Sequence, residues 1–214
     1  FKKNLTGDLK VAQFGGYVSE VSGYKHGKAS IIETIIRMAQ NFTFSNNINY
    51  LYPNGAFGSR SSNGDDHASA RYIFTSLENI TRYIIRKEDD PLLKSIFDEG
   101  EYIEPEMYYP IVPMLLVNGS EGMGVGFSTT IQQYNLLDII DNIKNYLNNE
   151  EMKELYPWFR NFKGRIEKVK SHTYITYGKY DIVNENEIII TELPVGIWTN
   201  NYKLFLNTLI ENTK

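Results

Sequence analysis

The sequence predicts an α+β protein, with helices in its first half and strands mixed with helices in its second. Apolar residues recur at helical spacing over residues 11–21 and 31–39. Four short segments of strand type follow one another between residues 165 and 191. This change of pattern predicts a domain boundary near residue 110, with one domain at residues 1–110 and a second at 111–214.

Composition excludes several classes of protein. With 42% hydrophobic residues, a chain of 214 residues can bury a core in one or two domains. No apolar run approaches the roughly 18 residues of a membrane-spanning helix. The absence of cysteine excludes disulfides and thiolate metal sites. Because the sequence starts at Phe1 and stops in polar residues, we expect it to be a piece of a longer protein.

Charge is unevenly distributed along the chain. The net charge is −4, yet residues 1–72 hold eight Lys and Arg against five acidic residues, whereas the remainder holds 14 against 21. A basic segment of this kind is typical of a surface that meets a polyanion. Ordinary solvated charge is the alternative that the counts leave open.

Two helices are expected first, joined by a cationic turn. The first has Val11, Phe14, Val18 and Val21 on one face, and its Gly15-Gly16 pair predicts close approach of another backbone. The apolar stripe of the second is Ile31, Ile32, Ile35, Ile36 and Ala39. Ser30 and Glu33 have the spacing of a capping box at its start. Two helices joined by a short glycine-containing turn resemble a helix-turn-helix.

The later elements follow from the same patterns. We expect a loop or short strand at 41–54, a glycine-rich loop at 55–64, helices at 77–85 and 92–97, a buried strand at 111–117, a helix at 136–147, strands at 165–169, 174–177, 180–183 and 187–191, and a helix at 202–210.

Familiar cofactor motifs are excluded by their spacing. Gly122, Gly124 and Gly126 do not form a dinucleotide fingerprint, because Phe127 stands where the third glycine belongs. The three histidines are scattered without metal-ligand spacing. Neither a phosphate-binding P-loop nor a nucleophile elbow is present in the sequence.

The pair Arg71-Tyr72 is the candidate reactive site. A phenol with a pKa of about 10 is roughly one part in a thousand ionised at neutral pH, so a nucleophilic tyrosine needs a neighbouring cation or base. Arg71 can grip a phosphate and neutralise charge on a transferring phosphoryl group. His26 can hydrogen-bond to the same phosphate or move a proton. With 16 tyrosines in the chain, a structural role for Tyr72 is the alternative on residue types alone.

A collinear set of short motifs runs along the chain: Lys10–Gln13, Gly16–Glu20, Tyr24–Gly27, Ala39–Phe42, Ser45–Asn49, Pro53–Arg60, Ala70–Thr75, Val117–Gly124, Asn161–Gly164 and Glu192–Val195. Together they resemble the breakage-reunion region of type IIA DNA topoisomerases, in the eukaryotic and large-DNA-virus branch rather than bacterial gyrase. The resemblance covers essentially the whole chain.

The resemblance implies roles for particular residues. Tyr72 matches the tyrosine that attacks a DNA phosphodiester and becomes joined to the 5′ phosphate. Arg71 matches the arginine at the scissile phosphate, and His26 the histidine of the same site. Four further cations fall in segments that line the duplex in the family; they are Lys10, Lys25, Lys28 and Arg60. Met123 matches the apolar wedge that enters between base pairs and bends the DNA.

Two positions depart from the family pattern. Lys25 stands where many relatives have a second histidine, which puts an acid–base role at that position in doubt. Met123 stands where isoleucine is usual. Methionine is longer and more flexible, so we expect the wedge to insert with different bending energetics.

The resemblance also implies a fold and partners. It implies a winged-helix domain of the catabolite-activator type followed by an incomplete α/β tower domain. The implied cofactors are Mg²⁺ and ATP, bound by toprim and ATPase domains outside this sequence. The implied partners are double-stranded DNA and a second copy in a homodimer, with action in the nucleus, or in the cytoplasm, viral factory or nucleus of a host if the source is a virus. The alternatives are a winged-helix module that binds DNA without cutting it and an enzyme that joins tyrosine to the 3′ phosphate.

Overall fold

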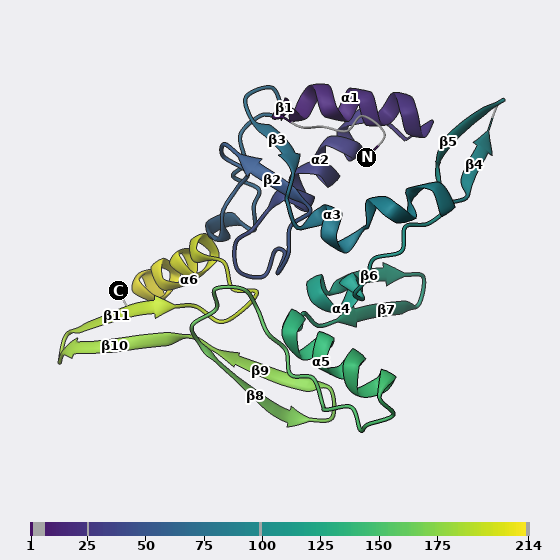
Figure 1. Cartoon of the computed structure of the whole chain (residues 1–214). Coiled ribbons are helices and arrows are strands. Elements are labelled where there is room, and N and C mark those ends of the chain that lie inside the picture. The colour runs from purple at the N-terminus through teal and green to yellow at the C-terminus, as the bar shows by residue number, and fades with distance from the viewer. Residues whose placement is uncertain (2–6, 25, 99, 213–214) are drawn as a thin grey trace. The chain divides into compact units, whose positions relative to one another are not determined.

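The computed structural model describes residues 1, 7–24, 26–98 and 100–212 (Figure 1). Its contacts divide the chain into two compact units. Unit 1 contains residues 1–41, 48–58 and 67–114, and unit 2 contains residues 42–47, 59–66 and 115–214. The chain therefore enters unit 2 twice, at residues 42–47 and 59–66, before it crosses for the last time at Leu115. Among the described residues, no helix has the length and apolar character to span a membrane.

Unit 1 is built on two helices and a three-stranded sheet. The helices are α1 (Val11–Ser22) and α2 (Lys28–Ala39). The strands are β1 (Leu9–Lys10), β2 (Leu51–Asn54) and β3 (Phe74–Leu77), antiparallel in the order β1-β3-β2. The helices lie beside this sheet (Figure 1). Between them the core contains Val11, Ile31, Ile35, Ile36, Ala39, Leu51, Phe57 and Ile73.

The interface of α1 and α2 depends on a missing side chain. A Cβ added to Gly15 would lie 2.7 Å from Cγ1 of Ile32 but 3.9 Å from its Cα, so the group that approaches Gly15 most closely is a side chain and not the expected backbone. The predicted capping box is wrong, because α2 begins two residues before Ser30. Its N-cap is Gly27, and the hydroxyl of Ser30 lies 3.2 Å from that of Tyr24 instead.

Two predicted helices of unit 1 differ in the structure, the first in its bounds and the second in its type. The segment predicted as helix 77–85 starts with the end of β3, and its only α-helix is α3 (Thr81–Ile84). Strand β3 is central, since Thr75 pairs with Leu9 on one side and Pro53 on the other. The helix expected at 92–97 is a 3-10 turn at Lys87–Leu92, then β4 (Ser95–Asp98), which pairs with β5 (Glu101–Pro105).

Unit 2 consists of hairpins and helices. The predicted buried strand at 111–117 is wrong. Met114 and Val117 are buried three residues apart on α4, as a helix places them. The remaining helices and the four predicted strands are confirmed. The elements are α4 (Met114–Asn118), β6 (Ser120–Gly124), β7 (Phe127–Ile131), α5 (Leu136–Leu147), β8 (Arg165–Lys170), β9 (Thr173–Tyr177), β10 (Lys179–Asn184), β11 (Glu187–Glu192) and α6 (Thr199–Asn212).

The strands of unit 2 form separate antiparallel hairpins, β6–β7, β8–β9 and β10–β11. Helices and antiparallel strands in both units give the protein the predicted α+β class.

Candidate active site

Arg71 and Tyr72 lie in unit 1, on the turn that leads into β3. The backbone N–H of Tyr72 donates to the carbonyl of Ser69 at 2.8 Å. The side chain of Tyr72 is 67% exposed, whereas the next residue, Ile73, is buried in the core. The guanidinium carbon of Arg71 lies 5.1 Å from the centre of the Tyr72 ring. The pair is thus accessible and in direct contact, and it is anchored by the residue that follows.

The first turn of α1 fixes the backbone on both sides of this pair. The N–H groups at the start of a helix have no partner within the helix. Here Val11 N–H donates to the carbonyl of Ile73, and Ala12 N–H to the carbonyl of Ala70, each at 3.0 Å. These two carbonyls bracket Arg71 and Tyr72. Arg71 and Tyr72 therefore have exposed side chains on a fixed main chain, the arrangement that a positioned nucleophile requires.

Three other tyrosines lie in partly buried surroundings. Burial raises the pKa of Tyr50, Tyr108 and Tyr134. A raised pKa keeps a phenol neutral, and a neutral phenol is a poor nucleophile. Their surroundings therefore do not favour nucleophilic chemistry.

The other predicted residues of unit 1 lie around these elements. His26 is exposed in the turn between α1 and α2, with its ring edge-on to Tyr24 at 5.4 Å. Lys28 is the first residue of α2, and its Nζ would lie 3.1 Å from a Cβ on Gly16. Lys10 is exposed at the end of β1, with its Nζ 5.9 Å from the ring of Phe74. Lys25 lies outside the described residues.

These contacts bring together only part of the predicted set. Arg71 and Tyr72 touch each other, whereas His26, Lys28 and Lys10 make the contacts just described with other residues.

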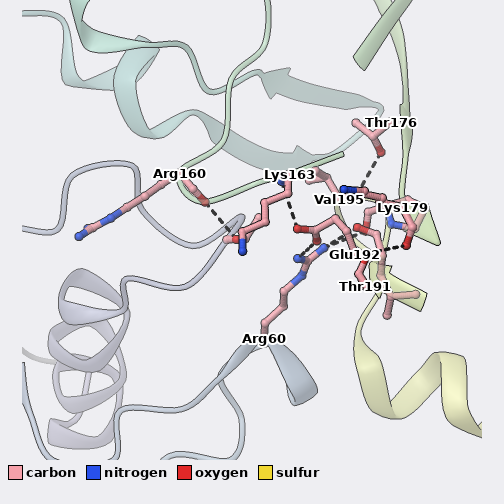
Figure 2. A network of polar contacts seen from close by, with 11 residues as sticks. Arg60, Arg160, Lys163, Thr176, Lys179, Thr191, Glu192 and Val195 are labelled. Atoms are coloured by element: carbon pink, nitrogen blue, oxygen red, sulfur yellow. Dashed lines mark hydrogen bonds and ion pairs between the residues drawn. The ribbon is translucent and has the colours of Figure 1, made fainter. Parts of the chain in front are cut away.

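Arg60 lies in unit 2, on the 3-10 turn Arg60–Ser62. Its guanidinium forms an ion pair with the nearly buried carboxylate of Glu192 and donates to the carbonyl of Leu193 at 2.6 Å. The same carboxylate accepts the backbone N–H of Lys163 at 3.1 Å (Figure 2). This geometry gives Arg60 an internal role that the sequence did not predict. Its contact with DNA stays a prediction.

Met123 lies near the tip of the β6–β7 hairpin in unit 2. It pairs across the hairpin with Ser128, and its side chain is 91% exposed. Its neighbours Val125 and Phe127 are 100% and 82% exposed. A row of apolar side chains with this exposure on a two-stranded ribbon can enter an apolar layer in a partner, such as the space between stacked base pairs.

Comparisons with known proteins show the family to which the chain belongs. The family model that describes the A subunit of DNA gyrase/topoisomerase IV matches residues 1–214. The chain belongs to this family. DNA topoisomerase 2 of Candida albicans is 48% identical over 214 residues, which is 100% of this chain and 15% of that protein. DNA topoisomerase 2 of Saccharomyces cerevisiae is 50% identical over 206 residues, 96% of this chain and 14% of that protein.

A solved structure is similar over nearly the whole chain. It is described as the Plasmodium falciparum topoisomerase II DNA-binding, cleavage and re-ligation domain. The TM-score is 0.95 at 50% identity, and the match covers 98% of this chain and 29% of that one. This topoisomerase-family chain spans 14–15% of the length of the two curated relatives named above.

Potential metal ligands are dispersed over the described part of this topoisomerase-family chain. Within residues 1, 7–24, 26–98 and 100–212, no group of three or more His, Asp or Glu side chains is arranged to hold a metal ion. The described residues therefore do not form a site for a divalent metal.

Sequence reasoning missed three kinds of functional support. The helix–carbonyl contacts that bracket Arg71-Tyr72 depend on where α1 begins. The pairing of Arg60 with Glu192 joins residues 132 positions apart. Asn47, at 7% exposure, donates to carbonyls 70 to 111 residues away. The only signal for Asn47 was its place in the Ser45–Asn49 motif, which carries no information on its partners.

Proposed function

We propose that this chain is the DNA cleavage–religation region of an ATP-dependent type II DNA topoisomerase. The observation that carries the proposal is an exposed Tyr72 in contact with Arg71, on a backbone held on both sides by α1. Family membership supports it, because the matched relatives are named DNA topoisomerase 2. The activity of the whole enzyme is part of the proposal, since the chain spans only 14–15% of those two relatives.

The proposed reaction is a reversible phosphoryl transfer. The phenolic oxygen of Tyr72 attacks the phosphorus of a DNA phosphodiester and loses its proton. A bond forms between the tyrosine oxygen and the 5′ phosphate, the bond to the 3′ oxygen breaks, and that oxygen leaves as a protonated hydroxyl. Religation is the reverse step and needs no ATP, because the phosphotyrosine retains the energy of the broken bond. Two such breaks open a double strand for the passage of another duplex.

The neighbouring residues have matching roles in the proposal. Arg71 contacts the scissile phosphate and neutralises charge that builds on its oxygens. His26 donates a hydrogen bond to the same phosphate. Lys10, Lys25, Lys28 and Arg60 contact phosphates of the bound duplex and set its position without reading its sequence. Met123 enters between base pairs and bends the duplex.

The wider context is also proposed. Residues 1–110 would be the winged-helix domain of the DNA gate, and residues 111–214 an incomplete tower domain. The partners would be double-stranded DNA and a second copy of the enzyme. Mg²⁺ and ATP would be held by other domains of the whole enzyme, where the metal would supply charge stabilisation to the phosphate. The site of action would be intracellular, with the nucleus expected for a cellular enzyme, although one relative is named as mitochondrial.

A Tyr72→Phe substitution in the intact enzyme tests the proposal. The phenylalanine keeps the ring and its contact with Arg71 but removes the nucleophilic oxygen. We expect covalent protein–DNA adducts and supercoil relaxation to disappear, while the affinity for duplex DNA stays within about twofold. The matched control is Tyr83→Phe, because Tyr83 is also exposed in unit 1. Relaxation that survives in the Tyr72 variant would contradict the proposal.

The second candidate is a winged-helix module that binds DNA without cutting it. The α1–α2 pair with its cationic turn favours this candidate, because helix pairs of this kind dock on duplex DNA. In that case the Tyr72→Phe variant would match the parent in every assay, and the parent itself would form no adduct. Labelling the two DNA ends of an adduct separates the 5′ attachment proposed here from the 3′ attachment of other tyrosine enzymes.

A further inference from the structure

The β6–β7 hairpin has no packing of its own that could hold Met123 in place. Every residue from Ser120 to Thr130 is exposed. The two strands contact each other by backbone pairing, and their side chains point into solvent. The direction in which the hairpin presents Met123 is therefore decided at its base.

The base of the hairpin is closed by short contacts. Gly119, just before β6, has a positive φ of 68°, and a Cβ there would lie 2.6 Å from the carbonyl oxygen of Ile131. Beyond β7, the N–H of Tyr134 donates to the carbonyl of Leu116 at 2.9 Å. The chain entering the hairpin and the chain leaving it thus lie against each other.

Asn47 joins both sides of this base. Its Nδ2 donates to the carbonyl of Val117 at 2.9 Å, before the hairpin, and to the carbonyl of Tyr134 at 3.3 Å, after it. The same nitrogen lies 3.0 Å from the carbonyl of Trp158. The Oδ1 atom accepts the N–H of Arg160 at 2.8 Å. One buried amide therefore ties together three segments of unit 2.

Gln133 forms a second hydrogen-bonded link between the hairpin base and residues 42–47. Its Nε2 donates to the carbonyl of Ser45 at 2.8 Å, and its backbone carbonyl accepts the N–H of Trp158 at 2.8 Å. Gln133 is 5% exposed and follows β7 by two residues. Segment 42–47 is thus bonded to the hairpin base twice. Asn47 donates to carbonyls at the base, and Gln133 at the base donates to the carbonyl of Ser45.

We propose that Asn47 is a positioning residue for the DNA wedge, acting through the base of the β6–β7 hairpin on Met123. The proposal rests on the proposed function, in which Met123 enters the duplex. Met123 lies four residues beyond Gly119, which is about 13 Å at strand geometry. A tilt of about 5° at the base then moves Met123 by about 1 Å over that length. Errors of this size at a reaction centre can cost about 100-fold in rate.

The amide of asparagine suits this position chemically. It offers two N–H donors for the surrounding carbonyls and one oxygen acceptor for a backbone N–H. Aspartate has the same shape and keeps the acceptor, but an ionised carboxylate donates nothing. Asn47→Asp therefore removes the donor to the carbonyls of Val117, Tyr134 and Trp158 and keeps the acceptor for the N–H of Arg160.

The experiment compares Asn47→Asp with Asn49→Ala in the intact enzyme. Asn49 is the matched control, because it is 6% exposed in the same loop but bonds to Leu51 and Glu78 of unit 1. Duplex bending is measured by fluorescence transfer between labelled DNA ends, together with cleavage and binding. We expect Asn47→Asp to reduce bending and to lower cleavage about tenfold or more, with binding within about threefold. Asn49→Ala should leave bending unchanged.

Combination with Met123→Ala separates positioning from general loss of structure. If Asn47 acts through Met123, Asn47→Asp has no further effect on bending once Met123 is alanine. An additive effect of the two substitutions would overturn the proposal, as would normal bending by Asn47→Asp alone. Should Asn47→Asp fail to fold, Gln133→Met removes the bond to Ser45 at similar side-chain length and is held to the same outcomes.

The same set of variants distinguishes a failure of the wedge role of Met123 from a failure of the positioning role of Asn47. If Met123→Ala bends DNA normally, the wedge role in the proposed function is wrong. If Met123→Ala loses bending and Asn47→Asp does not, the wedge stands and the role of Asn47 is wrong.

Discussion

At the scale of single residues, the candidate site combines an accessible nucleophile with a permanent cation. Tyr72 owes its position to its neighbours, because Ile73 is buried in the core and the carbonyl of Ala70 is bonded to α1. Arg71 has a planar guanidinium that can make two parallel bonds to a phosphate, which a lysine cannot do. This difference makes the identity of residue 71 testable.

We expect Arg71→Lys to slow cleavage while sparing DNA binding. The charge is retained, but the bidentate contact with the scissile phosphate is lost, and loss of one such stabilising contact typically costs about 100-fold in rate. Single-turnover cleavage of a labelled duplex measures the effect. Arg86→Lys is the control, since Arg86 is an exposed arginine of unit 1 whose partner is Glu88. A cleavage rate equal to that of the control would exclude the proposed role.

Arg60 shows how a cation expected on DNA can have a second role inside the protein. Its side chain is 21% exposed and that of Glu192 is 6% exposed, so the pair is shielded from solvent. Removal of one partner from such a pair leaves an uncompensated charge.

Arg60→Ala should therefore lower the free energy of unfolding by about 3–5 kcal/mol. Glu192→Gln keeps an acceptor for the backbone N–H of Lys163 and should cost about 1–3 kcal/mol. Urea denaturation of the single and double variants gives the coupling between the two side chains. Equal and additive losses would mean that the pair does not interact in solution.

At the scale of elements, two parts of α1 along its length have separate roles. Its first turn binds the carbonyls that bracket Arg71-Tyr72, and its middle packs against α2 through Gly15. A change in the fit of α1 on α2 would thus change the backbone support of Arg71 and Tyr72.

The two adjacent glycines of α1 give a matched test of that packing. Gly15→Ala would bring a methyl group within 2.7 Å of Cγ1 of Ile32 and should destabilise the protein by about 1–3 kcal/mol. At Gly16 the nearest atom is the flexible end of Lys28, at 3.1 Å, so Gly16→Ala should be neutral or stabilising by up to about 1 kcal/mol. Thermal denaturation measures both. The reverse order of stabilities would show that α1 and α2 pack differently.

At the scale of the whole molecule, two short segments of the first half of the chain, residues 42–47 and 59–66, belong to unit 2. The crossing at 42–47 is bonded to the base of the β6–β7 hairpin through Asn47, and the crossing at 59–66 to β11 through Arg60. Both crossings lie in the sequence between α2 and the nucleophile. The predicted phosphate contacts Lys10 and Lys28 both belong to unit 1, despite the net charge of −4.

The charge distribution predicts a particular salt dependence. Each phosphate contact releases counterions, so Lys28→Ala should weaken binding about equally for all DNA sequences and reduce the slope of log K against log salt by about one. Lys144→Ala is the control, because Lys144 is on α5 in unit 2 and faces Asp141. Titrations of duplex DNA at several salt concentrations measure both slopes. An unchanged slope for Lys28→Ala would remove Lys28 from the interface.

By itself, the sequence determined the features that are written locally. Helices α1, α2, α5 and α6 and the strands β8 to β11 were predicted, because their apolar residues repeat at the period of the element. The Arg71-Tyr72 pair was also found from the sequence, since adjacency needs no fold. The identification of the family likewise came from short collinear motifs.

The tertiary structure decided whatever depends on distant partners. Leu77, predicted as the start of a helix, is the last residue of strand β3, which is held on its two sides by the pairing of Thr75 with Leu9 and Pro53. Arg60 pairs with Glu192, which is 132 residues away in the sequence. Asn47 bonds to the two sides of the β6–β7 hairpin base, 70 and 87 residues away. Such contacts leave no periodic trace in the chain, because they form only when folding brings remote segments within hydrogen-bond distance.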